Sequence, residues 1–180
     1  MNIYLIGFSG TGKTSSGLQA AKILNWRFLD TDKQIEIVQG KTIAQIFEEF
    51  GEDYFRSLET QILNETIQES KLIVSTGGGL PTQKENVEIM TKSGFIIQLT
   101  ASAQTIYRRL TKSHQKNDQP IRPLIGNTIT KQEINEFLAK RETVYSISNL
   151  AINTDNKNFM QVAHEIVGQW KRIQKGTLDI

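Results

Sequence analysis

The segment IGFSGTGKTSSG, near the start of this 180-residue chain, constrains the fold more than any other part of the sequence. It joins an apolar run, residues 3–6, to an amphipathic run that predicts a helix over residues 13–24. Residues 7–14 fit the pattern G-x-x-x-x-G-K-S/T in full, in the strand–loop–helix context of a phosphate-binding loop. The N–H groups of such a loop and the dipole of its helix bind phosphate oxygens. We therefore predict a nucleotide site in which Lys13 contacts the β- and γ-phosphates and Thr14 ligates Mg²⁺.

Short apolar runs alternate with helical patterns along the rest of the chain. The runs predict strands at residues 3–6, 27–30, 72–75, 95–99 and 150–153. Helices are expected over 13–24, 42–68 with a break near Gly51, 102–110, 130–148 and 159–173, with capping boxes at Thr42, Thr82 and Thr130. Short apolar strands between helices predict an α/β fold, a three-layer α/β/α arrangement around a five-stranded parallel sheet. The length suits a single domain of residues 1–175 with a tail at 176–180.

Polar and glycine residues follow the predicted strands, where parallel sheets bind their ligands. Asp30 and Asp32 end the second strand, and Gly77, Gly78 and Gly79 follow the third. The two carboxylates suit division of work between a metal ion and a substrate hydroxyl, although helix capping is an alternative role. The three glycines allow a backbone with bare N–H donors to approach a ligand closely, and a flexible connection is the alternative.

Arginines are the candidate anion-binding residues. Arg56, Arg122 and Arg141 stand far apart in sequence, so only the fold can bring them together. Arg122 lies in the polar segment 111–126, which contains two prolines and has no periodicity. A long loop of this kind suits a lid that closes over the transferring phosphate. Arg108 and Arg109, just before that segment, are candidates for a cation–π contact with a nucleotide base, and an exposed helix end is the alternative.

Composition excludes several other classes of protein. A net charge of +2 argues against nucleic-acid binding through a broad basic surface. The sequence has no cysteine, which excludes a disulfide framework and thiolate metal sites and fits a reducing compartment. The N-terminal apolar run is too short for a signal peptide or a membrane span. We therefore expect a cytoplasmic protein without nucleic-acid or membrane partners.

Six short segments, taken in order, make the sequence similar to a known family. GFSGTGKT, DTD, GEDYFRSLE, STGGG, RPL and AKRETVY together resemble the shikimate kinases, over residues 2–170. This resemblance implies a P-loop kinase fold with strand order 2-3-1-4-5, acting as a monomer. It also implies transfer of the γ-phosphoryl of ATP, with Mg²⁺, to the 3-hydroxyl of shikimate in aromatic amino-acid biosynthesis.

The same resemblance implies roles for individual residues. Asp32 would hold the shikimate hydroxyls and orient or deprotonate the nucleophile. Arg56 and Arg141 would clamp the substrate carboxylate, Glu59 would hold Arg56, and the backbone of Gly77, Gly78 and Gly79 would complete the pocket. Lys13 and Arg122 would neutralise charge on the transferred group, while Thr14 and, through water, Asp30 would manage Mg²⁺. The substrate-binding helical segment would cover about 33–61. The implied ATP-binding residues are Ser9, Gly10, Thr11, Gly12, Lys13, Thr14, Ser15, Arg109, Arg122 and Lys157.

The sequence departs from the family around the adenine site. Asn153 and Lys157 stand where the family usually has an acid and an arginine, and Phe159 replaces a proline. The lid segment also looks longer than usual. These changes concern adenine contacts and lid kinetics, not the chemistry.

Several competing interpretations were weighed. A dinucleotide-binding loop would place a third glycine at position 15, which is serine. A gluconate or nucleoside-monophosphate kinase is the nearest rival. An acceptor without a carboxylate would leave two buried arginines unpaired, but gluconate has one, so the GGG and FRxxE signatures have to decide against a gluconate kinase. A GTPase switch would need an N-K-x-D motif, and the segment NKNF at Asn156 lacks the aspartate. A catalytically dead module would be expected to lose Lys13, Asp32 or a clamp arginine, and all are present.

Overall fold

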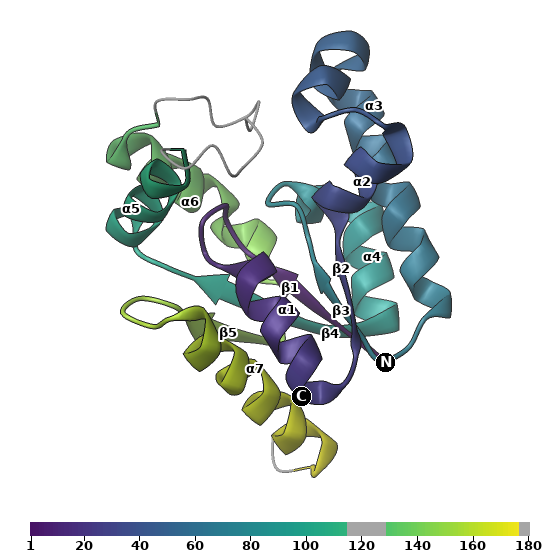
Figure 1. The fold of residues 1–180 in the computed structure, drawn as a ribbon, viewed down its shortest axis with the longest axis vertical. Helices are drawn as coiled ribbons and strands as arrows, with labels where there is room; N and C mark the ends of the chain where they lie inside the picture. The colour runs from purple at the N-terminus through teal and green to yellow at the C-terminus, as the bar shows by residue number, and fades with distance from the viewer. Residues whose placement is uncertain (115–128, 177–180) are drawn as a thin grey trace.

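A five-stranded parallel sheet with helices on both faces forms the centre of the molecule (Figure 1). The computed structural model describes residues 1–114 and 129–176. The sheet has the order β2-β3-β1-β4-β5, which confirms the predicted arrangement. Its strands are β1 (Asn2–Ile6), β2 (Arg27–Asp30), β3 (Leu72–Ser75), β4 (Gly94–Thr100) and β5 (Leu150–Asn153).

The central strand β1 pairs in parallel with β3 on one side and β4 on the other. All five of its residues are buried, as expected for a strand covered by helices on both faces. Its side chains alternate between two hydrophobic clusters: Ile3 and Leu5 face one layer, and Tyr4 and Ile6 face the other. The edge strands β2 and β5 are partly exposed.

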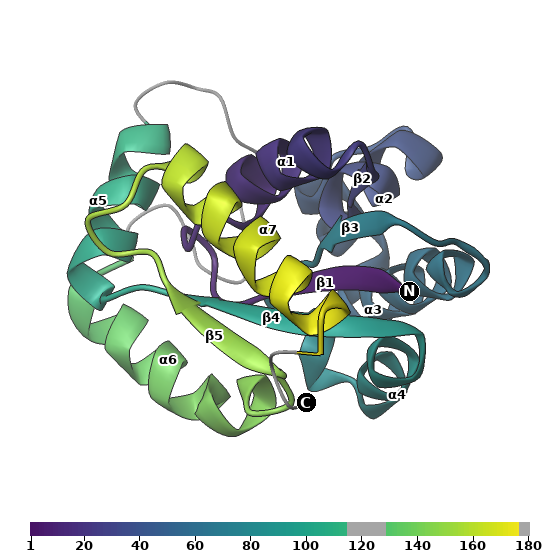
Figure 2. The same ribbon diagram turned by 90° about the horizontal axis from the view of Figure 1, so that it is seen from below.

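Two helical layers cover the sheet (Figure 2). Helices α1 (Lys13–Leu24) and α7 (Phe159–Gln174) pack together on one face. Helices α3 (Ile43–Glu65), α4 (Lys84–Ser93) and α6 (Lys131–Tyr145) lie on the opposite face. The remaining elements are α2 (Thr31–Gln39), α5 (Ala103–His114) and two short 3₁₀ helices, η1 (Thr66–Gln68) and η2 (Leu80–Thr82). None of the helices in the described ranges is long and apolar enough to span a membrane.

Local signals at the helix ends were mostly, but not always, interpreted correctly. The capping boxes at Thr42 and Thr130 are both present, and the predicted break at Gly51 has φ 80° and ψ 178°. The expected box at Thr82 is wrong. The Thr82 hydroxyl donates to the Gly79 carbonyl at 2.7 Å within η2, and α4 begins afterwards with Gln83 as an N-cap that makes no side-chain bond.

Two helix boundaries also differ from the prediction. Helix α5 continues to His114 rather than ending at Leu110, so the first four residues of the predicted lid are helical. Polar residues continue a helix readily when its apolar side, here Ile106 and Leu110, is already packed. Helix α6 ends at Tyr145, earlier than predicted. Arg122 and the rest of the predicted lid lie outside the described residues.

The contact between α1 and the sheet depends on a glycine. A Cβ at Gly17 would lie 2.7 Å from Leu5 Cδ1 and 2.9 Å from Phe28 Cε2, both side chains of the core. Because neither distance is possible for a real Cβ, any side chain at position 17 would push the helix away from the sheet. This close approach helps to fix the helix that follows the phosphate-binding loop.

We predict that Gly17→Ala lowers the free energy of unfolding by about 1–3 kcal/mol, the usual cost of overpacking a core. The matched control is Gly168→Ala in α7, where an added Cβ meets nothing within 4 Å. That variant should gain about 0.5–1 kcal/mol from helix propensity alone. Chemical denaturation of both variants measures the difference, and a stabilised Gly17→Ala would contradict this account of the packing.

Candidate functional site

A cavity of about 730 Å³ opens at the carboxyl ends of the strands. This volume is in the range expected for a small-molecule site. Every site residue predicted from the sequence within the described part of the chain lines it, from the phosphate-binding loop to Arg141 and Lys157. The fold therefore brings together residues that the sequence separates by more than a hundred positions.

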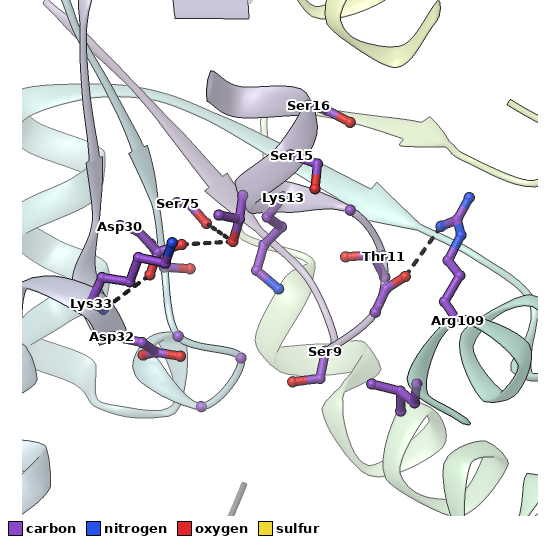
Figure 3. A pocket seen from close by; sticks show the side chains of 18 of the residues that line it. Ser9, Thr11, Lys13, Ser15, Ser16, Asp30, Asp32, Lys33, Ser75 and Arg109 are labelled. Atoms are coloured by element: carbon purple, nitrogen blue, oxygen red, sulfur yellow. Dashed lines mark hydrogen bonds between the residues drawn. The ribbon is translucent and has the colours of Figure 1, made fainter. Parts of the chain in front are cut away.

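The phosphate-binding loop forms one wall of this cavity. Gly12 is the N-cap of α1 with φ 96°, a left-handed conformation that favours glycine. The buried Lys13 ammonium donates to the carbonyl oxygens of Gly7 at 2.6 Å and Phe8 at 3.0 Å. Figure 3 shows the Lys13 side chain extending into the cavity between Asp32 and Ser9. The loop thus combines a helix N-terminus with a cation, which is what a phosphate chain requires.

Thr14 and Asp30 lie together beside the loop. The Thr14 hydroxyl donates to Asp30 Oδ2 at 2.6 Å and lies 3.3 Å from the Ser75 hydroxyl. Asp30 also caps α2, because its Oδ1 accepts from the Lys33 N–H at 3.2 Å. The metal-binding and capping interpretations of Asp30 are therefore compatible.

This pair of oxygen donors fits Mg²⁺. Mg²⁺ prefers hard oxygen ligands and is commonly held by one or two carboxylates together with substrate phosphates, rather than by an all-protein cage. Residues 1–114 and 129–176 contain no group of three or more His, Cys, Asp or Glu side chains arranged for a metal ion.

The Gly77–Gly79 loop lies where charged side chains approach its backbone. A Cβ on Gly77 would come within 2.6 Å of both Asp32 Oδ1 and Glu59 Oε1, and one on Gly79 within 2.7 Å of the Arg56 guanidinium. None of the three has a left-handed φ, and a Cβ on Gly78 would make only ordinary contacts at 3.5 Å or more, so space favours glycine at Gly77 and Gly79 alone. The expectation of three bare N–H donors is partly wrong, because the Gly77 N–H donates to the Thr31 hydroxyl at 2.9 Å.

Arg56 is held by two carboxylates on its own helix. Its Nη1 donates to Glu59 at 2.6 Å, and its Nη2 and Nε donate to Glu52 at 2.9 and 3.2 Å. Three of the five guanidinium N–H groups are used in this way, which leaves two for a ligand. The argument that a neutral acceptor would leave Arg56 unpaired is therefore wrong, because the protein itself pairs it.

The Arg56–Glu59 pair is largely buried, with side-chain exposures of 11% and 1%. Burial raises the pKa of Glu59 to about 7, against the opposing attraction of Arg56. Burial also works to lower the pKa of Arg56, but the nearby carboxylates of Glu59 and Glu52 outweigh it and raise that pKa. Glu59 therefore holds the arginine at the cost of keeping a carboxyl group out of water.

Arg141 reaches the same loop from α6. Its Nη1 donates to the Gly78 carbonyl at 3.1 Å, and its guanidinium lies over the rings of Phe8 and Phe137 at 5.6 and 5.9 Å. The Tyr145 hydroxyl donates to the same carbonyl at 2.8 Å. The sequence analysis missed Tyr145, although its spacing of four residues from Arg141 in a predicted helix places both on one face.

Arg109 lies on the other side of the phosphate-binding loop from Asp30 and Asp32 (Figure 3). It donates to the Gly10 carbonyl at 3.2 Å and to the hydroxyl and carbonyl of Thr154 at 2.9 and 2.8 Å. Burial lowers its pKa, while Asp155 opposes that effect. Lys157 lines the cavity nearby, with its ammonium paired to Glu165 at 2.6 Å. Both cations are thus held in place next to the segment where the sequence departs from the family pattern.

The raised pKa of Glu59 predicts that the stability of the fold depends on pH. Between pH 4.5 and about 7 the folded chain keeps a proton on Glu59 that the unfolded chain releases. Proton binding to Glu59 therefore stabilises the folded state at low pH, and this stabilisation is lost as the pH rises towards 7. We expect the free energy of unfolding of the wild type, relative to Glu59→Gln, to fall by about 1 kcal/mol per pH unit between pH 5 and 7. Urea denaturation at several pH values measures it. Glu136→Gln, which removes an exposed carboxylate of α6, is the control. If the wild-type free energy of unfolding changes with pH by the same amount relative to Glu59→Gln as relative to Glu136→Gln, the prediction is contradicted.

Comparison with known proteins agrees with this geometry. A family model described as shikimate kinase matches residues 9–171. Shikimate kinases from Sulfurihydrogenibium sp. and Persephonella marina are 42% and 39% identical to the chain, over 95% and 93% of its length and 98% of theirs.

Solved structures show the same likeness. A shikimate kinase from Acinetobacter baumannii, solved in complex with shikimate, superposes with a TM-score of 0.85 at 32% identity, over 99% of this chain and 95% of that one. A gluconokinase from Sinorhizobium meliloti, at 13% identity and a TM-score of 0.57 over 98% and 94% of the two chains, shares the fold alone. On the extent of the family match and of the sequence identity, the chain belongs to the shikimate kinase family.

Proposed function

We propose that this protein transfers the γ-phosphoryl group of ATP to the 3-hydroxyl of shikimate, giving shikimate 3-phosphate and ADP on the route to aromatic amino acids. The observation that carries the proposal is the meeting of Asp32, Arg56 and Arg141 around the Gly77–Gly79 loop, in the cavity that the phosphate-binding loop also lines. A carboxylate for hydroxyl groups and arginines for a carboxylate suit a small acidic polyol. Family membership supports the same substrate.

The donor half of the reaction is assigned to the phosphate-binding loop. Its backbone N–H groups and Lys13 would hold the β- and γ-phosphates and stabilise the charge that develops on the transferred group. The flanking residues Ser9 to Ser15 would complete this cradle. Thr14 and Asp30 would hold Mg²⁺, which when bound neutralises phosphate charge.

The acceptor half is assigned to Asp32 and the two arginines. Asp32, which packs against Gly77, would orient the 3-hydroxyl and accept its proton as the new phosphate ester forms. Arg141 and the two remaining N–H groups of Arg56 would bind the substrate carboxylate. Residues 33–61 would act as the substrate-binding segment in this scheme. The role of Arg122 and the lid at 111–126 stays a prediction from the sequence.

Nucleotide selectivity is assigned to the other end of the cavity. Arg109 offers a fixed guanidinium for a base to lie on, with Lys157 beside it. We propose further that the enzyme is cytoplasmic and has no nucleic-acid or membrane partners, on the strength of its low net charge and its lack of cysteine. That it works as a monomer stays a prediction from the family resemblance.

The test is an assay of ADP release with Mg²⁺ and ATP against shikimate, gluconate and nucleoside monophosphates. We expect turnover with shikimate and little with the others. Turnover with gluconate, or none with shikimate at millimolar concentration, would refute the proposed substrate.

We predict that Asp32→Asn folds and binds ATP like the wild type but loses phosphoryl transfer, by about 100-fold or more in kcat, because the general base is removed. ATP affinity measured by calorimetry and the unfolding midpoint serve as controls on the same preparation. Near-normal turnover would show that another group takes the proton.

For Arg141→Ala we expect the KM for shikimate to rise by about 30- to 150-fold, equivalent to the loss of about 2–3 kcal/mol in a charged hydrogen bond, with a smaller change in kcat. Lys140→Ala, the loss of an exposed cation on the same helix, is the matched control and should leave the KM unchanged. Equal KM values for the two variants would place the carboxylate contact elsewhere.

A further inference from the structure

We infer that Tyr145 is a positioning residue for the acceptor: its hydroxyl holds the Gly78–Gly79 peptide in the orientation that substrate binding needs and leaves Arg141 free to turn to the substrate carboxylate. This inference rests on the proposed function. It concerns a side chain that lies behind the site rather than one that touches the substrate.

The contact is built for a fixed role. Tyr145 is the last residue of α6 and is only 3% exposed, with its ring in the core cluster that also contains Leu80. Its hydroxyl donates to the Gly78 carbonyl at 2.8 Å, a shorter bond than the 3.1 Å from Arg141 to the same oxygen. Burial raises the pKa of Tyr145, so the hydroxyl keeps its proton and remains a donor.

Fixing this carbonyl also fixes the amide that follows it. No peptide bond in the described ranges is cis, and in a trans peptide the N–H points opposite to the carbonyl. Because α6 holds the Gly78 carbonyl on its own side, the Gly79 N–H points away from α6. In the described part of the chain, neither the Gly78 nor the Gly79 amide donates a hydrogen bond to a protein acceptor. These are the two amides of the loop that remain for a ligand.

The loop is fixed at three points, each next to a residue assigned to the substrate. Thr31, beside Asp32, holds the Gly77 N–H. The Arg56 guanidinium lies against Gly79. Tyr145, one helical turn from Arg141, holds the Gly78 carbonyl. Tyr145 thus provides the connection between the loop and the helix that carries the second arginine.

This arrangement matters when a carboxylate arrives. Arg141 and Tyr145 share the Gly78 carbonyl in the structure. When Arg141 turns its N–H groups to the substrate, Tyr145 keeps the carbonyl paired, so substrate binding does not leave a buried acceptor without a donor. Without the hydroxyl, Arg141 would have to serve both the carbonyl and the substrate.

The experiment compares Tyr145→Phe with Tyr4→Phe. Both remove one buried hydroxyl and keep the ring, but Tyr4 bonds to Thr66 and Ser93, which have other partners and do not line the cavity. We expect Tyr145→Phe to raise the KM for shikimate about tenfold, equivalent to about 1.4 kcal/mol, with kcat and the KM for ATP within about twofold of wild type. Tyr4→Phe should leave kcat and both KM values within about twofold of wild type, even if its unfolding midpoint falls as far as that of Tyr145→Phe.

Each outcome decides the question. A shikimate KM within about twofold of wild type in Tyr145→Phe, or an ATP KM that rises in the same proportion, overturns the inference while the wild type still turns over shikimate. If Tyr145 had only a general structural role, Tyr145→Phe would lower the unfolding midpoint and would change the KM for shikimate and the KM for ATP alike. If the wild type itself fails to phosphorylate shikimate, the proposed function fails, and the inference fails with it.

Discussion

The packing of two glycines, Gly77 and Gly79, against charged side chains is the constraint on which the acceptor half of the site depends. At Gly77 and Gly79 the backbone lies so close to Asp32, Glu59 and Arg56 that an added Cβ would displace these side chains. The loop can approach these groups because it lacks side chains, and the groups keep their places because the loop fills the space between them. Parallel strands end at this edge of the sheet, and residues from α2, α3 and α6 converge here.

The charges around this loop illustrate how a protein prepares for an anionic ligand. Arg56 is balanced by Glu59 and Glu52 before any ligand arrives, which avoids an uncompensated buried cation. Arg141 is placed differently, over aromatic rings and against a backbone carbonyl. One arginine is therefore rigidly paired, while the other has weaker partners that a carboxylate can replace.

The fold was predictable from the sequence to a large extent, because its signals are local and repeated. Short apolar strands, helix caps at Thr42 and Thr130 and the break at Gly51 depend on neighbouring residues alone. The prediction failed at Thr82 because a short 3₁₀ helix, η2, ends there: the Thr82 hydroxyl donates to the Gly79 carbonyl, and α4 begins only at Lys84. That the phosphate-binding loop, the Asp30–Asp32 pair and the three glycines would line one cavity was also predictable, since all of them follow strand ends. Their partners were not, because whether Glu52, Thr31 or Tyr145 bonds to a given group depends on distances that only the folded chain defines.

The break at Gly51 has a consequence for how this protein can vary. It separates the distal turns of α3, where Phe50 is 45% exposed, from the proximal helix that carries Arg56 and Glu59 and packs Ile62 and Leu63 into two core clusters. Because the backbone is not helical at the junction, a shift of the distal turns is not transmitted along a continuous rod to the arginine. Substitutions at exposed positions of these turns, such as Phe50, can therefore accumulate while Arg56 stays in place, whereas Ile43 and Ile46 are constrained by their packing in one cluster with Ile62.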